Sequence, residues 1–397
     1  QLNEEMETEV SEITGGIRTS QVAKTVEWLS KHGVEMNDLK AANVKKALKK
    51  KIEDPGARKV LETRAILSKT STKKLLPMRD CALPDGRVRG SLCYGGAYRT
   101  LRWAGRLIQI QNFPRGSLKP EQIAEVLSLL AARSAAQLRT FKGNPLENIA
   151  SCLRSLIIAP RKYKLYVADY SAIEARVLAW LCHQEDGLAE FHKGLDTYKI
   201  MASVIYNTTV ERVTTNQRKV GKDTVLGCGY NMGWSTFQKQ INNRGGEQIS
   251  KKLAQDAVEA YREKNDKIAG FWPNIEKAAK KAIKNPDTPQ KISYLTFEYD
   301  SLDDTLMMKL PSGRSLHYPQ PKIEAVPKPW NKKQKMMSIT FGAMYNSSWV
   351  RETTYGGKLT ENAVQGIARD LMAYGMRSAE RIGYERLTMT VHDELVA

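Results

Sequence analysis

Two aspartates of this 397-residue chain stand where predicted strands end, and they are the first candidates for chemistry. YVAD (166–169) reads as a buried strand that ends at Asp169, and LTMTVHDEL (387–395) reads as a strand that turns near Asp393. If these strands are neighbours, their carboxylates converge and repel unless a divalent cation binds between them. Two magnesium ions bridged by such a pair make a site for in-line phosphoryl transfer. Spacing alone leaves open two unrelated aspartates in turns.

A third carboxylate follows shortly after the first strand. Glu174 stands at the start of a segment with apolar residues at i, i+4, i+7 and i+8, which are Ile173, Val177, Trp180 and Leu181. This pattern predicts a helix with one buried face. The buried face would fix Asp169 and Glu174 relative to each other.

The segment RKVGKDTVLGCGYNMG (218–233) is a second candidate site. Four of its residues recur every four positions: Arg218, Lys222, Leu226 and Tyr230. We expect all four on one broad face of a helix. The two cations, helped by the helix N-terminus, suit the phosphates of a nucleoside triphosphate, and the other two residues suit its sugar and base. For this segment taken by itself, a basic surface helix is an equally open reading.

Composition indicates a soluble globular protein of two or three lobes, with 41% hydrophobic and 26% charged residues. The formal net charge of +19 points first to nucleic acid as a partner, second to an anionic membrane surface, and otherwise to solubility. No apolar run approaches the ~20 residues that a membrane span needs. The five cysteines include no CxxC pair, so we expect a reducing compartment and cysteines that serve as small core residues.

We expect both helices and strands to position these residues, so the predicted fold class is mixed α+β. Residues 1–78 read as helical and basic, with a break at Pro55-Gly56 and a phosphate-contacting lysine cluster at Lys69, Lys73 and Lys74. PDGR (84–87) reads as a turn within a strand-rich region, and 186–285 reads as mainly helical. Residues 291–320 read as strands around a turn at 311–314. Residues 360–383 read as a helix whose buried stripe is Val364, Ile367, Ala368 and Leu371.

Five ordered segments resemble motifs of the family A DNA polymerases, the bacterial DNA polymerase I-like family, and most closely those of its phage-type members. They are DYSAIE (169–174, motif A), RKVGKDTVLGCGY (218–230, motif B), VHDEL (391–395, motif C), RTLRWAGRLIQIQNFPRG (99–116, similar to the phage-type TGRWxGRxxQxQNLPR) and YGGKLTENAVQGIARDLM (355–372, the helix before motif C). The resemblance covers roughly residues 20–397.

This resemblance implies a right-hand architecture of thumb, palm and fingers, with the aspartates on an antiparallel palm sheet. The thumb would span 1–78, the palm 79–185 and 341–397, and the fingers 186–340. Leu395 to Ala397 look too short for the return strand of the motif C hairpin, so we expect a truncated C-terminus.

The resemblance also implies roles at the catalytic centre. Asp169 and Asp393, assisted by the Tyr170 carbonyl, would hold two Mg²⁺ ions, for which Mn²⁺ could substitute. Lys222 would give a proton to the departing pyrophosphate. Glu174, held by Tyr230, would be a steric gate against a 2′-hydroxyl. The residues implied to bind the deoxynucleoside triphosphate are Arg218, Lys222, Leu226, Tyr230, Glu174 and Tyr170.

A further group would bind primer–template DNA. Arg102 and Gln365 would donate to minor-groove acceptors of the primer-terminal pair, which look alike for all correct pairs. His392 would contact the terminal primer phosphate, Arg115 the primer or the triphosphate, and Lys73 the backbone. The implied protein is a monomer with replisome partners and no membrane association. It would be cytoplasmic, in a bacterial host if encoded by a phage.

The sequence departs from the family pattern at three positions and leaves two other functions open. Leu226 stands where Phe or Tyr is usual, Leu101 replaces a glycine, and Tyr198 stands where many relatives have histidine. The alternatives are a single-subunit RNA polymerase, which the Glu174 gate disfavours, and an inactive nucleic-acid-binding relative. The intact pairs Asp169/Asp393 and Arg218/Lys222 argue against the latter.

Overall fold

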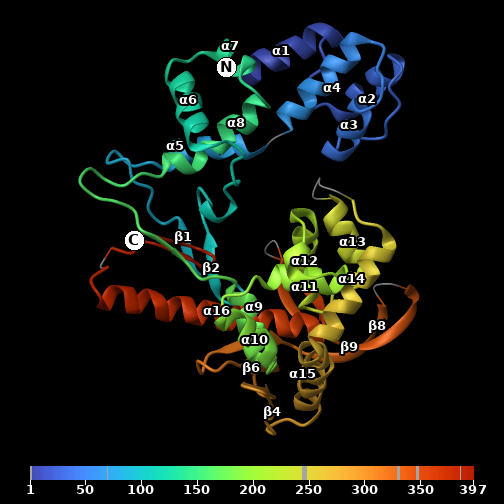
Figure 1. Ribbon diagram of the computed structural model, residues 1–397, viewed down its shortest axis with the longest axis vertical. Coiled ribbons are helices and arrows are strands. Elements are labelled where there is room, and N and C mark those ends of the chain that lie inside the picture. The colour runs from blue at the N-terminus through green and yellow to red at the C-terminus, as the bar shows by residue number, and fades with distance from the viewer. Residues whose placement is uncertain (1, 69, 244–247, 329–330, 346–347, 385) are drawn as a thin grey trace. The chain divides into compact units, whose positions relative to one another are not determined.

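The computed structural model describes residues 2–68, 70–243, 248–328, 331–345, 348–384 and 386–397 (Figure 1). The chain forms two compact units, each built from separate stretches. Unit 1 holds residues 1–93 and 105–165, and unit 2 holds residues 94–104 and 166–397. The division into thumb, palm and fingers stays a prediction. Among the described residues, no helix is both long and apolar enough to span a membrane.

The regular elements of unit 1 are helices, apart from the strand residues Leu92, Cys93 and Gly105, which lie where its two stretches meet unit 2. Its helices are α1 Leu2–Thr14, α2 Val22–Lys31, α3 Ala41–Leu48, α4 Pro55–Leu67, η1 Thr70–Lys74, α5 Leu75–Cys81, η2 Ile110–Asn112, α6 Pro120–Ala131, α7 Ala135–Thr140, α8 Pro145–Ser151 and η3 Leu153–Leu156. The predicted break at Pro55 is confirmed, because α4 begins there and the Asp54 carboxylate caps it through Ala57 N (2.9 Å). The predicted turn at 84–87 is also present, with Gly86 at φ 75°. Lys69 lies outside the described residues.

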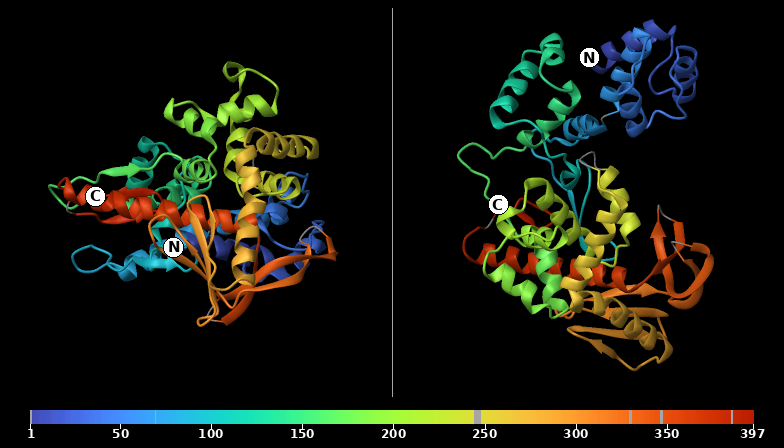
Figure 2. Two further views of the ribbon diagram at one scale, coloured as in Figure 1. Left: turned by 90° about the horizontal axis from the view of Figure 1, so that it is seen from below. Right: turned by 45° about the vertical axis from the view of Figure 1, so that its right-hand side comes forward.

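The helices of unit 2 surround its main core. They are α9 Ile173–Leu181, α10 Glu185–His192, α11 Thr197–Ile205, η4 Val210–Arg212, α12 Thr215–Cys228, α13 Trp234–Asn243, α14 Lys251–Lys264, α15 Asp266–Lys284 and α16 Gly356–Arg381. Buried side chains of α9, α12, α14, α15 and α16 meet in one hydrophobic cluster. Figure 2 shows the long α16 passing beside α9 and α15 in both views. Gln365, Ala368 and Arg369 of this helix line the cavity described below.

In the part of the chain that the structure describes, the strands form four sheets. β1 Leu92–Ala97 pairs with β2 Arg102–Gly105. The four-stranded sheet has the order β4 Gln290–Ile292, β5 Leu295–Asp300, β6 Thr305–Lys309 and β7 Ser315–Pro319. One three-stranded sheet has the order β10 Ser348–Thr354, β9 Asn331–Tyr345 and β8 Lys322–Lys328. The other has the order β11 Met389–Val391, β12 Glu394–Val396 and β3 Val167–Asp169. The predicted turn at 311–314 connects β6 to β7, with Gly313 at φ 84°.

The buried stripe of α16 differs from the prediction at its last position. Val364, Ile367 and Ala368 are buried, but Leu371 is 43% exposed. The last buried residue of the helix is Met372. Counted from Val364, Leu371 is i+7 and Met372 is i+8, and a helix of 3.6 residues per turn brings both positions back near the face of Val364. The stripe therefore ends one residue later than we expected.

Candidate active site

The strands that carry the two aspartates are neighbours. β3 runs antiparallel to β12, and Asp169 stands opposite Glu394. The β11–β12 hairpin turns through His392 and Asp393, with His392 in the left-handed region at φ 58°. A backbone bond from Tyr170 N to Asp393 O (3.1 Å) fixes the end of β3 to this turn. Asp169 and Asp393 therefore belong to adjacent positions at one end of a single small sheet.

Two expectations about this sheet are wrong. β3 is not buried, since all three of its residues are exposed and Val167 is 59% exposed. The residues after Asp393 are not too short for a return strand. The return strand is β12, which is the central strand of the sheet and pairs with β11 on one side and β3 on the other. Reciprocal backbone bonds between Tyr166 and Ala397 (both 2.9 Å) extend the pairing.

The predicted cationic helix is α12, which begins with a capping box between Thr214 and Gln217. It ends at Cys228, so Tyr230 lies beyond the helix and does not share its face, which corrects the prediction. Gly229 still has helical dihedrals (φ −60°), and the chain leaves the helical direction at Asn231, which has φ 62°, before α13 begins. Leu226, near the end of α12, is 49% exposed.

Arg218 is half-buried against α11, and the exposed Lys222 lies beside the same helix. The Arg218 Nε donates to Asp196 Oδ2 (2.6 Å), and the Tyr198 ring centre is 5.3 Å from the Arg218 guanidinium carbon and 5.8 Å from Lys222 Nζ. The two helices can approach because Gly221 has no side chain. A Cβ there would stand 2.2 Å from the Tyr198 carbonyl oxygen.

Electrostatics at this contact favour a charged pair. Burial acts to raise the pKa of Asp196, but the hydrogen bond and charge of Arg218, together with the backbone N–H groups of Lys199 and Tyr198, outweigh it, and the pKa lies below its usual value. Asp196 also caps α11 by accepting from the backbone N–H groups of Tyr198 and Lys199 (both 3.1 Å). Burial raises the pKa of Tyr198, so its ring presents a neutral face to the two cations.

Glu174, in the first turn of α9, is held from two sides. Its Oε1 accepts from Arg102 NH2 (2.7 Å), and its Oε2 faces the Tyr230 hydroxyl at 3.4 Å. Burial and the Glu174 carboxylate raise the pKa of Tyr230 well above its usual value, which keeps the hydroxyl a donor. The backbone before Tyr230 is fixed by a bond from Trp272 Nε1 to Gly229 O (3.0 Å).

One cavity of about 250 Å³ brings several predicted residues together. Its lining is Ala97, Arg102, Trp103, Ile173, Gln365, Ala368, Arg369, His392 and Asp393. Four of these are predicted site residues, from β2, α16 and the hairpin turn. Sequence reasoning missed Trp103 and Arg369. The only signal for them was their place inside the two segments similar to phage-type polymerases.

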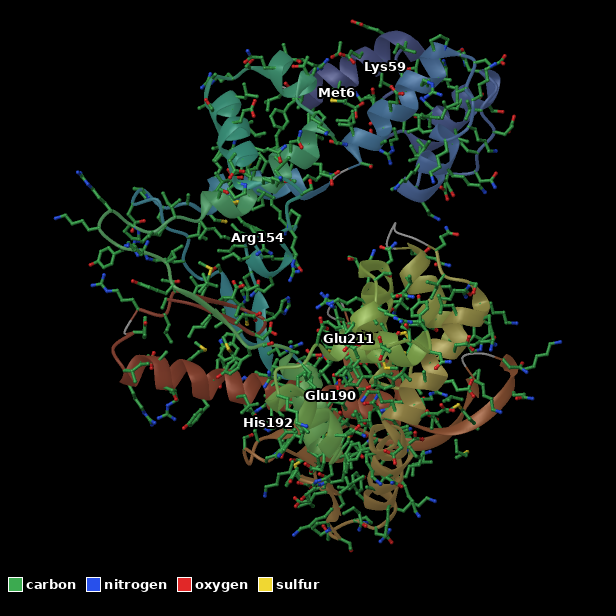
Figure 3. The ribbon with its side chains drawn as sticks, viewed as in Figure 1. Met6, Lys59, Arg154, Glu190, His192 and Glu211 are labelled. Carbon is green, nitrogen blue, oxygen red and sulfur yellow. The ribbon has the colours of Figure 1, made fainter. Side chains whose placement is uncertain are left out.

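The other two predicted DNA-binding residues belong to unit 1. Lys73 is exposed at the end of η1, and Arg115 is exposed in the loop after η2. Arg154, labelled in Figure 3, donates to the carbonyls of Phe113 and Pro114 (both 3.3 Å) and so fixes the start of that loop.

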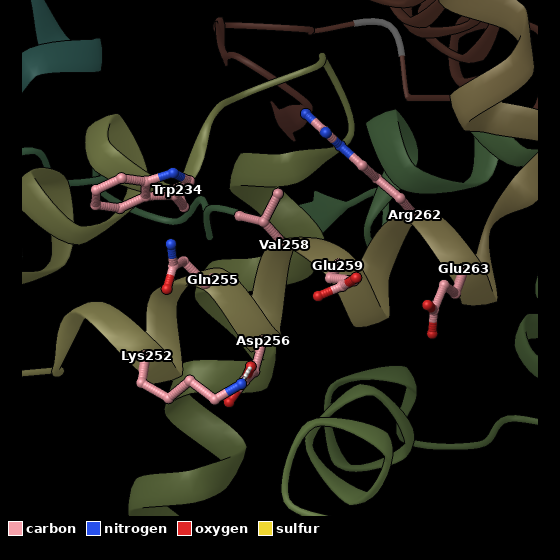
Figure 4. Close-up of a pocket in the computed structure, with 8 residues that line it drawn as sticks. All are labelled: Trp234, Lys252, Gln255, Asp256, Val258, Glu259, Arg262 and Glu263. Atoms are coloured by element: carbon pink, nitrogen blue, oxygen red, sulfur yellow. Dashed lines mark hydrogen bonds and ion pairs between the residues drawn. The ribbon is translucent and has the colours of Figure 1, made fainter.

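A larger cavity of about 680 Å³ lies on α13 and α14 (Figure 4). Its lining is Trp234, Lys252, Gln255, Asp256, Val258, Glu259, Arg262 and Glu263. No predicted site residue is among them, and two of its charges, Lys252 and Asp256, are paired with each other (2.6 Å). This cavity is therefore separate from the candidate active site.

The metal-ligand inventory is small. Within the part of the chain that the structure describes, no three His, Cys, Asp or Glu side chains are grouped to hold a metal ion. Asp169 and Asp393 offer two carboxylates, the hard oxygen ligands that Mg²⁺ prefers. Magnesium typically takes one or two carboxylates together with water and substrate phosphates, so a two-aspartate site fits this ion.

The chain belongs to DNA polymerase family A, whose model matches residues 6–296. The mixed α+β class is confirmed by likeness to the solved POL domain of Pol1 from M. smegmatis, described as a complex with DNA primer-template and dNTP. That match has a TM-score of 0.61 and 15% identity, and covers 100% of this chain and 59% of the other.

Among curated proteins, the chain is similar to the DNA polymerase of Bacillus phage SP02, with 35% identity over 393 residues. That match covers 98% of this chain and 58% of the phage protein, so this chain spans under two thirds of its relative. It is also 32% identical over 109 residues to DNA polymerase I of Pseudomonas aeruginosa, covering 28% of this chain and 11% of that protein.

Proposed function

We propose that this chain is the polymerase portion of a DNA-templated DNA polymerase. It extends a primer 3′ end with deoxynucleoside triphosphates and releases pyrophosphate. The single observation that carries the proposal is the pairing of β3 with β12, which brings Asp169 and Asp393 to the same sheet end in a family A chain. We also propose the right-hand division into thumb, palm and fingers described above.

The residues of the site divide the work. Asp169, Asp393 and the Tyr170 carbonyl would hold two Mg²⁺ ions, which supply charge neutralisation for in-line displacement when bound. Arg218 and Lys222 on α12 bind the triphosphate, and Lys222 donates a proton to the pyrophosphate leaving group. Before the triphosphate arrives, Asp196 keeps the Arg218 guanidinium in place (2.6 Å). Leu226, near the end of the same helix, packs against the incoming sugar.

The remaining residues select and position the substrates. Glu174, held by Arg102 and Tyr230, blocks a 2′-hydroxyl. Arg102 and Gln365 line one cavity with His392, which supports contacts to the primer-terminal base pair and its phosphate. Lys73 and Arg115 add backbone contacts from unit 1. The substrates are primer–template DNA and deoxynucleotides.

Two other functions are disfavoured by particular residues. An RNA polymerase needs space for the 2′-hydroxyl, whereas Glu174 is fixed by two partners. An inactive DNA-binding protein would not need two carboxylates at one sheet end beside a cationic helix. The test below separates all three functions.

Primer extension with Mg²⁺ tests the proposal directly. The parent protein should extend a labelled primer with deoxynucleotides but not with ribonucleotides. Asp169→Ala and Asp393→Ala should each lower extension by at least about a thousandfold, since each removes a ligand of the phosphoryl-transfer centre. Removing Mg²⁺ with a chelator should have the same effect.

The matched control is Asp303→Ala, which removes an exposed carboxylate from the β5–β6 turn. It should leave extension unchanged. Primer–template binding, followed by fluorescence anisotropy, should persist in all three variants because phosphate contacts supply most of the affinity. Full extension by Asp393→Ala, or preferred use of ribonucleotides by the parent, would reject the proposed function.

A further inference from the structure

The turn between β1 and β2 has a backbone conformation that its sequence does not favour. Leu101 has φ 57°, in the left-handed region where a leucine is disfavoured. The sequence resemblance expects glycine at this position. Within the turn, Leu101 N donates to Ala97 O (2.8 Å). One short-range hydrogen bond does not explain why a leucine keeps this conformation, so contacts from other elements are needed to hold the backbone of the turn.

Two arginines from other elements hold the carbonyls of this turn. Arg369 on α16 donates from Nε to Leu101 O (3.1 Å), and Arg314 donates from NH1 to Thr100 O (3.3 Å). Both arginines also pair with one carboxylate of Asp370, at 3.3 Å and 2.9 Å. Asp370 therefore holds both cations at the turn.

Arg369 is also enclosed by aromatic rings. It is 8% exposed, and its guanidinium carbon lies 4.7 Å from the Trp103 ring centre and 4.8 Å from that of Tyr94. These rings belong to β1 and β2, on the two sides of the turn. A planar guanidinium can stack on rings and donate in its own plane at the same time, which lysine cannot do.

The strained turn leads directly into the sugar-selecting contacts. Arg102 follows Leu101 and donates to Glu174 Oε1 (2.7 Å), while Tyr230 holds the other carboxylate oxygen. If the Leu101 backbone relaxed to negative φ, the direction of the chain at Arg102 would change. Glu174 would then lose the shorter of its two hydrogen bonds.

We propose that Arg369 is a positioning residue for sugar selection, acting through the Leu101 carbonyl on Arg102 and through Arg102 on Glu174. This inference rests on the proposed function, in which Glu174 is the gate. Arg369 itself lines the cavity next to Arg102 and needs no contact with the nucleotide. Its substitution changes the choice between deoxy- and ribonucleotides more than it changes deoxynucleotide turnover.

The test uses Arg369→Met, which keeps an unbranched side chain between the rings but removes the donor. The kcat/KM values for a deoxynucleotide and the matching ribonucleotide are measured by primer extension. We expect their ratio to fall about tenfold, the equivalent of one charge-assisted hydrogen bond. Arg377→Met, an exposed arginine on the same helix, is the matched control and leaves the ratio unchanged.

Suppression by glycine separates positioning from general stability. Glycine adopts positive φ without strain, so Leu101→Gly needs no anchor. In the Arg369→Met background it should restore the ratio to within about threefold of the parent value, whereas a merely structural loss would not be restored. Thermal unfolding of each variant accompanies the kinetics.

The outcomes are distinct. A ratio within twofold of the parent in Arg369→Met, or no restoration by Leu101→Gly, overturns the inference. If Arg369→Met does not fold but the double variant folds and discriminates, the inference is supported, and if neither folds it is overturned. A parent protein that extends no primer at all instead refutes the proposed function.

Discussion

At the scale of single residues, the proposed function assigns the choice of sugar to Glu174. Its carboxylate is held between Arg102 and Tyr230, so in the proposed function a sugar 2′-hydroxyl would meet a side chain that is held in place. Glu174→Ala should raise ribonucleotide incorporation relative to deoxynucleotide incorporation by about tenfold or more, because it removes both the bulk and the charge. Single-nucleotide primer extension with each substrate measures this ratio. Glu185→Ala, an exposed acid at the start of α10, is the control, and an unchanged ratio in Glu174→Ala would contradict the gate.

We expect Leu226 to influence a second selectivity, the choice between deoxy- and dideoxynucleotides. It is 49% exposed near the end of α12, where the sequence pattern expects an aromatic residue. Leu226→Tyr adds a ring and a hydroxyl donor on the side of the helix that we assign to the sugar, so the preference between deoxy- and dideoxynucleotides should change by at least about threefold. A terminator-incorporation assay measures it, with Leu226→Met as the apolar control of similar size. Equal preference in parent and Leu226→Tyr would show that this side chain does not reach the sugar.

At the scale of elements, α11 and α12 are joined through the Asp196–Arg218 pair. Asp196→Asn keeps the helix cap but removes the charge, and should destabilise the protein at pH 7 by ~0.2–1 kcal/mol, the range for partly exposed pairs. The folded-state pKa of Asp196 is lowered, so this contribution is fully present above the unfolded value of about 4. It is lost as the pH falls through the lower folded-state pKa.

Urea unfolding of parent and variant at pH 7 and at about pH 3 checks this dependence. The difference in free energy of unfolding should shrink at the lower pH. Asp266→Asn, at the start of α15, is a control whose effect has no link to Arg218. A difference that is equal at both pH values would mean that the Arg218 pair does not stabilise the fold.

Helix starts and turns that are marked by local residue types could be predicted from the sequence. The elements against which they pack or pair could not. The break at Pro55, the turn at 311–314 and most of the buried face of α9 follow from local residue types, although Trp180 of that face is only half-buried. The exposure of β3 depends on which strands pair and on what covers them, which no local pattern contains. The end of α12 before Tyr230 was missed because a four-residue spacing was extended past Gly229.

The same division holds for the candidate site. The sequence could place Asp169 and Asp393 at strand ends, and the register of β3 with β12 then makes them neighbours. Arg369 could not be found, because its partners Leu101 and Trp103 are more than 260 positions away in the chain. Residue preferences also could not predict a leucine at φ 57°, because they assign that region of backbone dihedrals mainly to glycine.

At the scale of the whole molecule, the chain carries a formal net charge of +19. A protein that neutralises phosphates releases the counterions condensed on DNA, so its affinity falls steeply with salt. The plot of log affinity against log salt concentration has a slope of about −0.9 for each phosphate neutralised on a duplex. The slope therefore counts ionic contacts without requiring any knowledge of how the two units are arranged.

Lys73 allows this count to be tested one residue at a time. If its exposed ammonium in unit 1 contacts a phosphate, Lys73→Ala should weaken primer–template binding equally for different sequences and make the slope less steep by about 0.9. Lys291→Ala removes an exposed lysine from β4, which has no assigned contact, and should leave the slope unchanged. Anisotropy titrations between roughly 50 and 200 mM salt provide the measurement. An unchanged slope in Lys73→Ala would remove η1 from the DNA-binding surface and leave its lysines as a solvated helix end, whereas an equal change in both variants would mean that the charge acts through the field of the whole protein rather than through a defined contact.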